Sequence, residues 1–263
     1  MNILVGNTGL IGTTLKKNIE FDFEFNSKDF HTYVSKVPDD EQCNLFLTCL
    51  PATKWQVNQN IIKDLNNINL IINNLATKKY NKIYLISTID VYCDSPLRSD
   101  ENTIPTINKL SYGTNRYLFE KMVEEILNYN RISIYRLPAL FSKDIKKNVL
   151  FDLLNNNSIE NININSIFQW YNLEYLYGDI IFNDEHYKHD LRHKFNMFSQ
   201  GVETKQIITE LFPEYLDKVN SKGLIYYNYC TNMDKSGYLY SSEESFNQIK
   251  EFVNEYRSKP SGI

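Results

Sequence analysis

Three glycines near the start of the chain have the spacing of a phosphate-binding loop. The segment Gly6–Gly12 reads GxxGxxG, follows an apolar run typical of a strand, and leads into a helical pattern. At such a turn the bare backbone can approach a pyrophosphate and the first N–H groups of the helix can bind it, whereas side chains at Gly6 and Gly9 would block the approach. The loop therefore predicts dinucleotide binding, and a glycine-rich turn without a ligand is the alternative.

The end of the second predicted strand should contact the adenosine ribose of such a dinucleotide. NAD sites usually have an acidic residue there, which accepts a hydrogen bond from the 2′-hydroxyl. This chain has Asn26, Ser27 and Lys28 instead, and a hydroxyl next to a cation suits a 2′-phosphate. NADP(H) is therefore the expected cofactor. NAD(H) is the alternative, in which Lys28 is an ordinary surface lysine.

Two later segments bear hydroxyl and cationic groups. Ser87–Tyr92 follows a buried strand pattern, and Tyr112–Arg116 opens a long helix, with Glu120 one turn further on. Together with the glycine loop, the Ser-Thr strand end and the YGxx(K/R)xxxE helix resemble the extended short-chain dehydrogenase/reductase family. That family contains sugar-nucleotide epimerases, dehydratases and reductases. The resemblance is strong over residues 1–142 and weaker beyond them.

The resemblance implies a catalytic set of Thr88, Tyr112 and Arg116. In the family a hydroxy residue, a tyrosine and a lysine act together, and the hydroxy residue lies four residues before an aromatic, as Thr88 lies before Tyr92. Arg116 occupies the lysine position. The resemblance also implies cofactor contacts from the glycine loop, the strand ends and the catalytic set: Gly6, Thr8, Gly9, Leu10, Ile11, Gly12, Asn26, Ser27, Lys28, Cys49, Leu50, Ser87, Tyr112, Arg116 and Leu137.

These residue types suit hydride transfer between a carbinol carbon and a nicotinamide, because the hydroxyl proton must be removed or supplied. A tyrosine does this at neutral pH only if its pKa falls from about 10. A cation one helical turn away, at about 5 Å and an effective dielectric of about 20, contributes roughly 3 kcal/mol, or about two pKa units. Arg116 should therefore lower the pKa of Tyr112, although it cannot itself lose a proton. The alternative is that both residues only dock the helix.

Two departures from the family narrow the reaction. Its 4,6-dehydratases carry Asp-Glu directly after the threonine, and this chain has Ile89 and Asp90, so 4,6-dehydration is not expected. The family's arginine and the asparagine three residues later correspond here to Arg136 and Ala139. One contact near the nicotinamide is therefore missing.

The expected substrate contacts come from Asp90 and from residues beyond the sheet. Lys146, Lys147 and Asn148 precede a helical pattern, and family members place an asparagine at a comparable point against the nucleotide diphosphate. A charged helix cap is the alternative. Gln169 is a candidate hydrogen-bond partner for a base or a sugar.

The sequence predicts no metal site. Three histidines have helical spacing that could bind zinc, but the segment is so polar that a solvated loop explains it better. The cysteines are scattered without a CxxC pair, which favours free thiols in a reducing compartment. The residues concerned are His186, His189 and His193, with Asp184, Glu185 and Asp190 nearby, and Cys43, Cys49, Cys93 and Cys230.

The elements that must position these groups alternate in a β-α-β rhythm, which predicts a parallel sheet with helices on both faces. We expect an α/β fold, a Rossmann-type doubly wound parallel sheet with a small C-terminal substrate-binding lobe. The domains are 1–142 for the dinucleotide and 143–263 for the substrate, the latter partly interleaved with the sheet. Strand patterns lie at 2–5, 21–25, 44–48, 83–87, 132–135 and 195–198, helical patterns at 10–17, 57–78, 112–127, 146–154, 173–181, 204–212 and 244–256, and further extended patterns at 159–165 and 224–229.

Composition restricts the function classes. The chain has 263 residues, of which 42% are hydrophobic and 14% aromatic, enough for a core. A net charge of −4 argues against a dedicated nucleic-acid binder. No apolar run approaches the roughly 18–20 residues of a membrane helix. The first residues run into a strand pattern rather than a signal peptide, so the expected location is the cytoplasm.

The sequence as a whole predicts an NAD(P)-dependent oxidoreductase or epimerase that acts on a nucleotide-activated sugar, with Tyr112 as acid and base. From the resemblance we also expect a role in polysaccharide assembly and a homodimer formed through the helices at 57–78 and 112–127. The alternative is a sensor or scaffold subunit that binds the cofactor without turnover, which the arginine at position 116 would suit.

Overall fold

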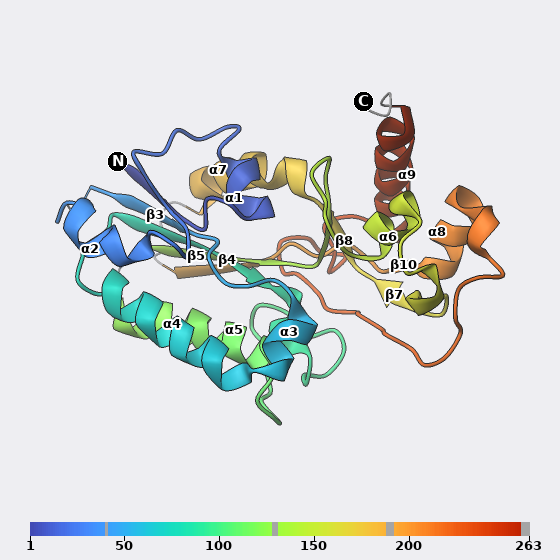
Figure 1. Cartoon of the computed structure of the whole chain (residues 1–263), viewed down its shortest axis with the longest axis horizontal. Helices are drawn as coiled ribbons and strands as arrows, with labels where there is room; N and C mark the ends of the chain where they lie inside the picture. Colours follow the sequence, from blue (N-terminus) through green and yellow to red (C-terminus); the bar gives the residue numbers. More distant parts are fainter. Residues whose placement is uncertain (40–41, 128–130, 188–191, 259–263) are drawn as a thin grey trace. The chain divides into compact units, whose positions relative to one another are not determined.

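The computed structural model describes residues 1–39, 42–127, 131–187 and 192–258, which form two compact units (Figure 1). The chain passes between the units after residues 96, 101, 136, 174 and 195. Unit 1 comprises Met1–Pro96, Asn102–Arg136 and Tyr175–Phe195, and unit 2 comprises Leu97–Glu101, Leu137–Glu174 and Asn196–Ile263.

Unit 1 is built on a six-stranded sheet with the strand order β2-β1-β3-β4-β5-β9. β1 pairs in parallel with β2 and with β3, and β3 pairs in parallel with β4. Strands β1, β3 and β4 are apolar over most of their length because both faces of such a sheet are covered. The predicted Rossmann-type α/β sheet is thereby confirmed. The strands are β1 Asn2–Val5, β2 Phe23–Phe25, β3 Asn44–Leu47, β4 Lys82–Thr88, β5 Ile132–Leu137 and β9 Arg192–Asn196.

Helices cover both faces of this sheet. In Figure 1, α1 and α7 lie on one side of it, and α2, α4 and α5 lie on the other. Helix α7 is fastened to the sheet by Asp184, whose carboxylate accepts hydrogen bonds from the Lys82 ammonium and the Tyr84 hydroxyl of β4. The helices of unit 1 are α1 Leu10–Leu15, α2 Tyr33–Lys36, α3 Lys54–Gln59, α4 Ile61–Leu75, α5 Tyr112–Ile126 and α7 Leu176–His186, with the 3₁₀ turns η1 Phe30–Thr32, η2 Ile89–Tyr92 and η4 Leu173–Tyr175, the last continuing from unit 2.

The predicted helix at 57–78 is two helices, α3 and α4. They meet at Asn60, whose backbone is not helical (φ −144°, ψ 63°) and whose side chain accepts a hydrogen bond from Lys63 N at 3.2 Å. An asparagine is a favoured N-cap because its short side chain satisfies a free N–H of the first turn. The break lets α3 take its own direction and bring Lys54 and Asn58 toward α5.

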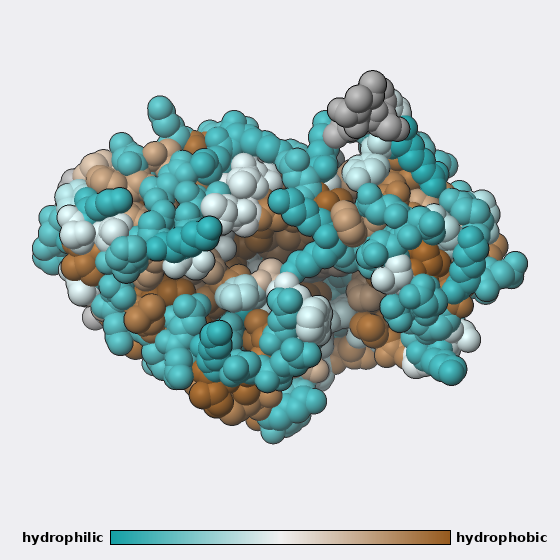
Figure 2. Space-filling view, in the orientation of Figure 1, coloured by the Kyte–Doolittle hydropathy of each residue, from teal (hydrophilic) through white to brown (hydrophobic). Residues whose placement is uncertain are grey.

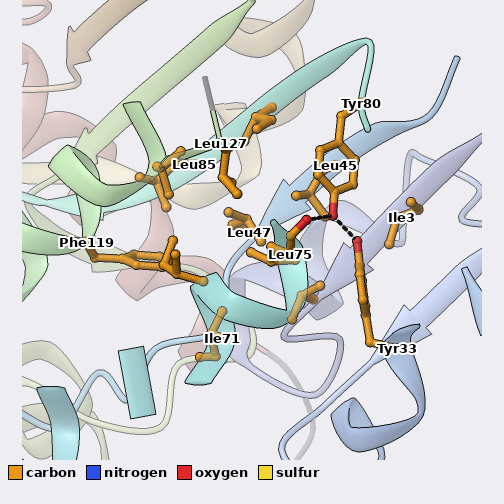
Figure 3. Packing of buried hydrophobic residues seen from close by; sticks show 14 of the residues in the cluster. Ile3, Tyr33, Leu45, Leu47, Ile71, Leu75, Tyr80, Leu85, Phe119 and Leu127 are labelled. Carbon is orange, nitrogen blue, oxygen red and sulfur yellow. Dashed lines mark hydrogen bonds between the residues drawn. The ribbon is translucent and has the colours of Figure 1, made fainter. Parts of the chain in front are cut away.

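The core of unit 1 lies between the sheet and helices α4 and α5 (Figure 3). Leu47 of β3, Leu75 of α4 and Phe119 of α5 are buried in it. The polar ends of two buried tyrosines satisfy each other there: the hydroxyls of Tyr33 and Tyr80 lie 2.6 Å apart, and Tyr80 also donates to the Leu75 carbonyl at 2.9 Å. Paired hydroxyls allow large aromatic rings to be buried without loss of their hydrogen bonds.

Unit 2 has two small sheets and its own core. β6 pairs in parallel with β8, and β7 pairs antiparallel with β10. Trp170 is 1% exposed and packs in this core with apolar residues of α6, α8 and α9. The elements are β6 Ala139–Phe141, β7 Ile167–Phe168, β8 Trp170–Asn172, β10 Val202–Glu203, α6 Val149–Asn155, α8 Thr204–Leu211, α9 Ser242–Ser258, η3 Ile159–Asn161 and η5 Pro213–Tyr215.

Two segments predicted to be extended differ in the structure. Residues 159–161 form a 3₁₀ turn, and 224–229 contributes only an isolated bridge between Tyr226 and Ile167. Leu224 and Ile225 are exposed, so their apolar pattern does not mark a buried strand. Within the described residues, no helix is long and apolar enough to cross a membrane.

Candidate active site

The glycine loop joins β1 to α1, and two of its glycines are required by the chain's own packing. Gly6 has φ +106°, and a Cβ there would lie 2.5 Å from Thr48 Oγ1. A Cβ at Gly12 would lie 2.2 Å from the Gly6 carbonyl oxygen. These contacts hold the loop in a tight strand-to-helix turn, so Gly6 is required by its backbone and by β3 even without a ligand.

Gly9 has no such requirement. Its backbone (φ −75°, ψ 163°) is one that any residue adopts, and a Cβ there would meet only the Gly6 oxygen at an ordinary 3.5 Å. Thr8 and Gly9 are exposed, and Leu10 and Ile11 are partly buried. A glycine that the protein does not itself need suits a ligand lying directly against the backbone, as a pyrophosphate does. The loop therefore fits a dinucleotide.

The segment after β2 forms a compact turn. The Asp29 carboxylate accepts hydrogen bonds from Asn26 N at 2.6 Å and Asn26 Nδ2 at 3.2 Å, and Asn26 Oδ1 accepts from Lys28 N at 2.9 Å. Ser27 and Lys28 are exposed. The acid of the turn is thus bonded to Asn26, while a hydroxyl and an ammonium face solvent.

The other predicted cofactor contacts are placed differently. Burial raises the pKa of the Cys49 thiol to about 12, although the nearby charge of Arg116 lowers it, so Cys49 is a neutral thiol after β3. Leu50 packs against the core of unit 1. The Ser87 hydroxyl donates to the Glu120 carboxylate. Leu137 is buried and belongs to unit 2.

Close packing of α5 on the turn that follows β4 brings the start of this helix, with Tyr112, against η2, which Thr88 caps. Thr88 Oγ1 caps η2 and accepts from Asp90 N at 3.2 Å, which leaves its own hydrogen available for donation. A Cβ at Gly113 would lie 1.9 Å from the Asp90 carbonyl oxygen, so only glycine allows this approach. Tyr112 N donates to Asn58 Oδ1 of α3 at 2.7 Å. The start of α5 is therefore held from two sides.

Arg116 lies beside Tyr112 but is paired with an acid on α4. Its guanidinium carbon is 4.4 Å from the centre of the Tyr112 ring. Nη1 and Nη2 donate to the two carboxylate oxygens of Asp64 at 2.8 and 3.2 Å, and Nη2 donates to the Pro51 carbonyl at 2.7 Å. Both side chains are 5% exposed. This fork-to-carboxylate geometry needs an arginine, since an ammonium cannot form it.

The predicted fall in the pKa of Tyr112 is wrong for the protein as it stands. Burial raises the pKa of this phenol above its usual value, the charge of Arg116 lowers it by less, and the charge of Asp90 raises it further. Tyr112 is 7% exposed, so the loss of solvation of the phenolate outweighs a cation that also has a carboxylate partner. The phenol is therefore protonated at neutral pH.

A second buried ion pair fixes the middle of α5 to the sheet. Glu120 accepts from Arg136 Nη2 at 2.6 Å and from Arg136 Nε at 3.0 Å, with the side chains 0% and 1% exposed. Arg136 also donates to the Tyr92 hydroxyl, and Ser87 donates to Glu120. Ser87 of the strand end, the aromatic Tyr92 and the glutamate of the helix motif thus belong to one hydrogen-bonded network around Arg136.

The predicted substrate residues are found in both units. In unit 1, Asp90 accepts a hydrogen bond from Lys54 Nζ at 2.6 Å. In unit 2, Asn148 caps α6, accepting from Phe151 N at 3.2 Å and donating to the Leu140 carbonyl at 2.7 Å. Asn148 thus acts as a helix cap, which is the alternative that the sequence offered to a diphosphate contact.

Lys147 and Gln169, also in unit 2, differ in their exposure. Lys147 is exposed, and partial desolvation lowers the pKa of its ammonium. Gln169 is 1% exposed, and its amide bonds the backbone of Ser199 and Tyr229 at 2.6–2.8 Å. Because the core occupies both ends of this amide, the substrate contact expected of Gln169 is replaced by a structural role.

The histidine segment is only partly described. His186 stacks on Phe182 at 3.8 Å, and His193 stacks on Phe195 at 5.2 Å, whereas His189 and Asp190 lie outside the described residues. Among the residues that the structure describes, no three metal-ligating side chains form a group that could hold a metal ion.

The sequence interpretation missed Asp64, Lys54 and the structural role of Glu120. A signal existed for Asp64, because it lies between Ile61 and Ile68 on the apolar stripe of its helix, where a carboxylate needs a buried partner. For Glu120 the only sequence signal of its role was its position in the helix motif, and this signal was weaker. Lys54 had none, because its partner is set by how α3 packs.

No protein-family model matches the sequence, and no curated protein matches it. Solved structures do match. The dTDP-4-dehydrorhamnose reductase of Bacillus anthracis in complex with NADP superposes with a TM-score of 0.67 at 16% identity, covering 97% of this chain and 98% of that chain.

Two further matches have related descriptions. MoeE5 in complex with UDP-glucose and NAD gives a TM-score of 0.71 at 10% identity, and UDP-glucose 4-epimerase of Thermotoga maritima with UDP-glucose gives 0.62 at 15%. Each covers 98% of this chain and 99% of its own. The fold of this chain is therefore the one seen in these solved structures, which are described as a sugar-nucleotide reductase, a UDP-glucose complex and a UDP-glucose epimerase.

Proposed function

We propose that the protein is an NAD(P)-dependent oxidoreductase or epimerase that transfers a hydride at a carbinol or keto carbon of a nucleotide-activated sugar. The observation that carries this proposal is the placement of Tyr112 and Thr88. Packing of Gly113 on the Asp90 carbonyl sets the start of α5 against the turn that follows β4, in the same unit as the glycine loop after β1, and this supports the proposal. Ligands of such sheets bind outside the carboxyl ends of the strands.

The proposed chemistry divides between the cofactor and the chain. When bound, the nicotinamide supplies or accepts the hydride. Tyr112 donates its proton to the carbonyl oxygen in reduction, or takes the hydroxyl proton in oxidation, and Thr88 donates a hydrogen bond that orients the same oxygen. The raised pKa of the phenol favours the proton-donor role at neutral pH. The Arg116 guanidinium lies over the Tyr112 ring, 4.4 Å from its centre.

NADP(H) is the proposed cofactor, with NAD(H) as the alternative. The exposed Ser27 and Lys28 offer a hydroxyl and an ammonium to a 2′-phosphate, and Asp29, which could otherwise accept from a 2′-hydroxyl, is already bonded to Asn26. A matched solved structure contains NADP and another contains NAD. Dissociation constants for NADPH and NADH decide between them. Lys28→Ala should weaken NADPH binding and leave NADH binding unchanged if the 2′-phosphate is held there.

The proposed substrates are sugars linked to UDP or dTDP, because the matched structures are described as enzymes or complexes of such compounds. Asp90 is the proposed contact in unit 1, and Lys147 is the proposed diphosphate contact in unit 2. We also propose a homodimer through α4 and α5. Ile62 and Leu70 of α4 are more than half exposed, as is Ile126 of α5. Figure 2 shows hydrophobic surface where Figure 1 draws α4.

The test is a panel of UDP- and dTDP-linked keto and hydroxy sugars with NADPH and NADH, followed by the absorbance of the reduced nicotinamide. Turnover that Tyr112→Phe abolishes and Tyr117→Phe preserves supports the proposal. Tyr117 is a suitable control because it is a tyrosine of the same helix on which other charges act, those of Lys121 and Glu120 first. Turnover that survives in Tyr112→Phe contradicts the assigned role. Cofactor binding without turnover on the whole panel favours the sensor or scaffold alternative. A cofactor that stays bound through purification identifies an epimerase, and an exchangeable one identifies a reductase.

A further inference from the structure

The Arg116 guanidinium is hydrogen-bonded to groups within the fold. Both its terminal nitrogens bond Asp64, and one also bonds the Pro51 carbonyl. The pair is buried and neutral as a whole, and a guanidinium does not lose its proton. The charge of Arg116 still lowers the pKa of Tyr112, and the neighbouring charged groups add to this effect or oppose it.

Several elements of unit 1 contribute charged or titratable groups near the Tyr112 phenol. Asp90 is 13% exposed, and its backbone touches Gly113, so a carboxylate lies beside the first turn of α5. The Sγ of Cys93 would lie 3.1 Å from a Cβ at Gly113. The charged and titratable groups are Arg116 of α5, Asp64 of α4, Lys54 of α3, and Asp90, Cys93 and Asp94 in and after η2.

Lys54 is held toward this cluster by α3. Asn58 lies one helical turn after Lys54, so the two side chains share a face of the helix, and Asn58 accepts the hydrogen bond from Tyr112 N at 2.7 Å. Lys54 Nζ donates to Asp90 Oδ1 at 2.6 Å. One face of α3 thus contacts both the backbone of Tyr112 and the carboxylate beside it. Lys54 is 46% exposed, so this pair exchanges with solvent, unlike the buried pair of Arg116.

We propose that Lys54 is a positioning residue for Tyr112: it neutralises Asp90 beside the phenol and so adds, from a different helix, to the electrostatic stabilisation of the phenolate that Arg116 supplies from α5. The inference rests on the proposed function for its catalytic meaning. Its physical content, the effect of the pair on the phenol, is independent of any substrate.

The two members of the pair act on the phenolate with opposite signs. An uncompensated Asp90 carboxylate opposes a second negative charge on Tyr112, and the Lys54 ammonium favours it. Loss of Lys54 alone should therefore raise the pKa of Tyr112, loss of Asp90 alone should lower it, and loss of both should largely cancel. A salt bridge that only ties α3 to η2 would give the same outcome for either loss.

The experiment is ¹⁹F NMR of the ligand-free protein with 3-fluorotyrosine, which brings the phenol titration to a lower pH. Tyr112→Phe assigns the resonance. Lys54→Gln should raise the titration midpoint of Tyr112 by roughly one pKa unit, Asp90→Asn should lower it by a similar amount, and the double variant should return to within a few tenths of a unit of the parent. Lys54→Arg should stay near the parent.

The matched control is Lys121→Gln, which removes another half-exposed, ion-paired lysine, bound to Glu124 on α5 at 3.2 Å. It should leave the Tyr112 resonance unchanged. Equal phenolate fractions at pH 10 in the parent, Lys54→Gln and Asp90→Asn, or shifts of the same sign in both, would overturn the inference. Because no substrate is present, absence of turnover in the sugar panel would refute the proposed function and leave this result standing.

Discussion

Removal of one member of the Arg116–Asp64 pair should destabilise unit 1 strongly, and removal of both should not. The two side chains are 5% exposed and joined by hydrogen bonds of 2.8 and 3.2 Å. A buried charge left without its partner costs about 3–5 kcal/mol, whereas replacement of a whole buried pair by apolar residues of similar volume is often neutral. Asp64→Leu and Arg116→Met should each lower the free energy of unfolding by about 3–5 kcal/mol.

The double variant should remain within about 2 kcal/mol of the parent, which makes the coupling energy of the cycle at least about 4 kcal/mol. The lost bonds to the Pro51 carbonyl and to Asn115 Nδ2, which donates to Asp64 at 2.8 Å, account for the remaining cost. The free energy of unfolding of Arg116→Lys should lie between those of the parent and of Arg116→Met, because an ammonium cannot bond both oxygens of Asp64 and the Pro51 carbonyl in the same geometry.

The assay is urea unfolding followed by far-UV circular dichroism. In a Trp55→Phe background, which removes the tryptophan of unit 1, fluorescence of the buried Trp170 serves as a separate reporter of unit 2, which does not contain the pair. In the single variants, the loss of stability should appear as a lower urea midpoint in the circular dichroism transition. Single variants that cost under about 1 kcal/mol, or a double variant whose cost is the sum of the two, would refute the assignment of Arg116 and Asp64 as a mutually dependent buried pair.

Three further outcomes follow from the site. Gly9→Ala should keep the parent's midpoint in thermal unfolding and lose at least about tenfold in NADPH affinity by titration, whereas Gly12→Ala, whose Cβ would lie 2.2 Å from the Gly6 oxygen, should unfold at a lower temperature. Glu120→Gln should lower the free energy of unfolding by about 3 kcal/mol in urea, since it leaves the Arg136 charge buried; a change under 1 kcal/mol would contradict this. Because burial raises the pKa of Tyr112, oxidation, which needs the phenolate, should accelerate as pH rises from 7 to 10, while reduction should stay level over neutral pH; an oxidation rate independent of pH would count against Tyr112 as the base.

Local patterns were sufficient for the sheet, the glycine loop and the order of the elements along the chain. The strands of unit 1 are short apolar runs because both faces of the sheet are covered, and the stripe on residues 61–75 records the face that α4 buries. The boundary between the units could not be predicted from local patterns, because it depends on contacts between residues far apart in the sequence. Residues 175–195 return to unit 1 through Asp184, whose partners in β4 lie about a hundred positions earlier.

By itself, the sequence determined the α/β architecture and the positions of Gly9, Thr88 and Tyr112, because strand periodicity, turn chemistry and helix starts are properties of neighbouring residues. Only the tertiary structure decided which charges act on the phenol. Arg116 finds its acid 52 residues away on α4, and Asp90 finds its cation 36 residues away on α3. The strength of a charge depends on its solvation and on its partners, and these are set by which helices pack together.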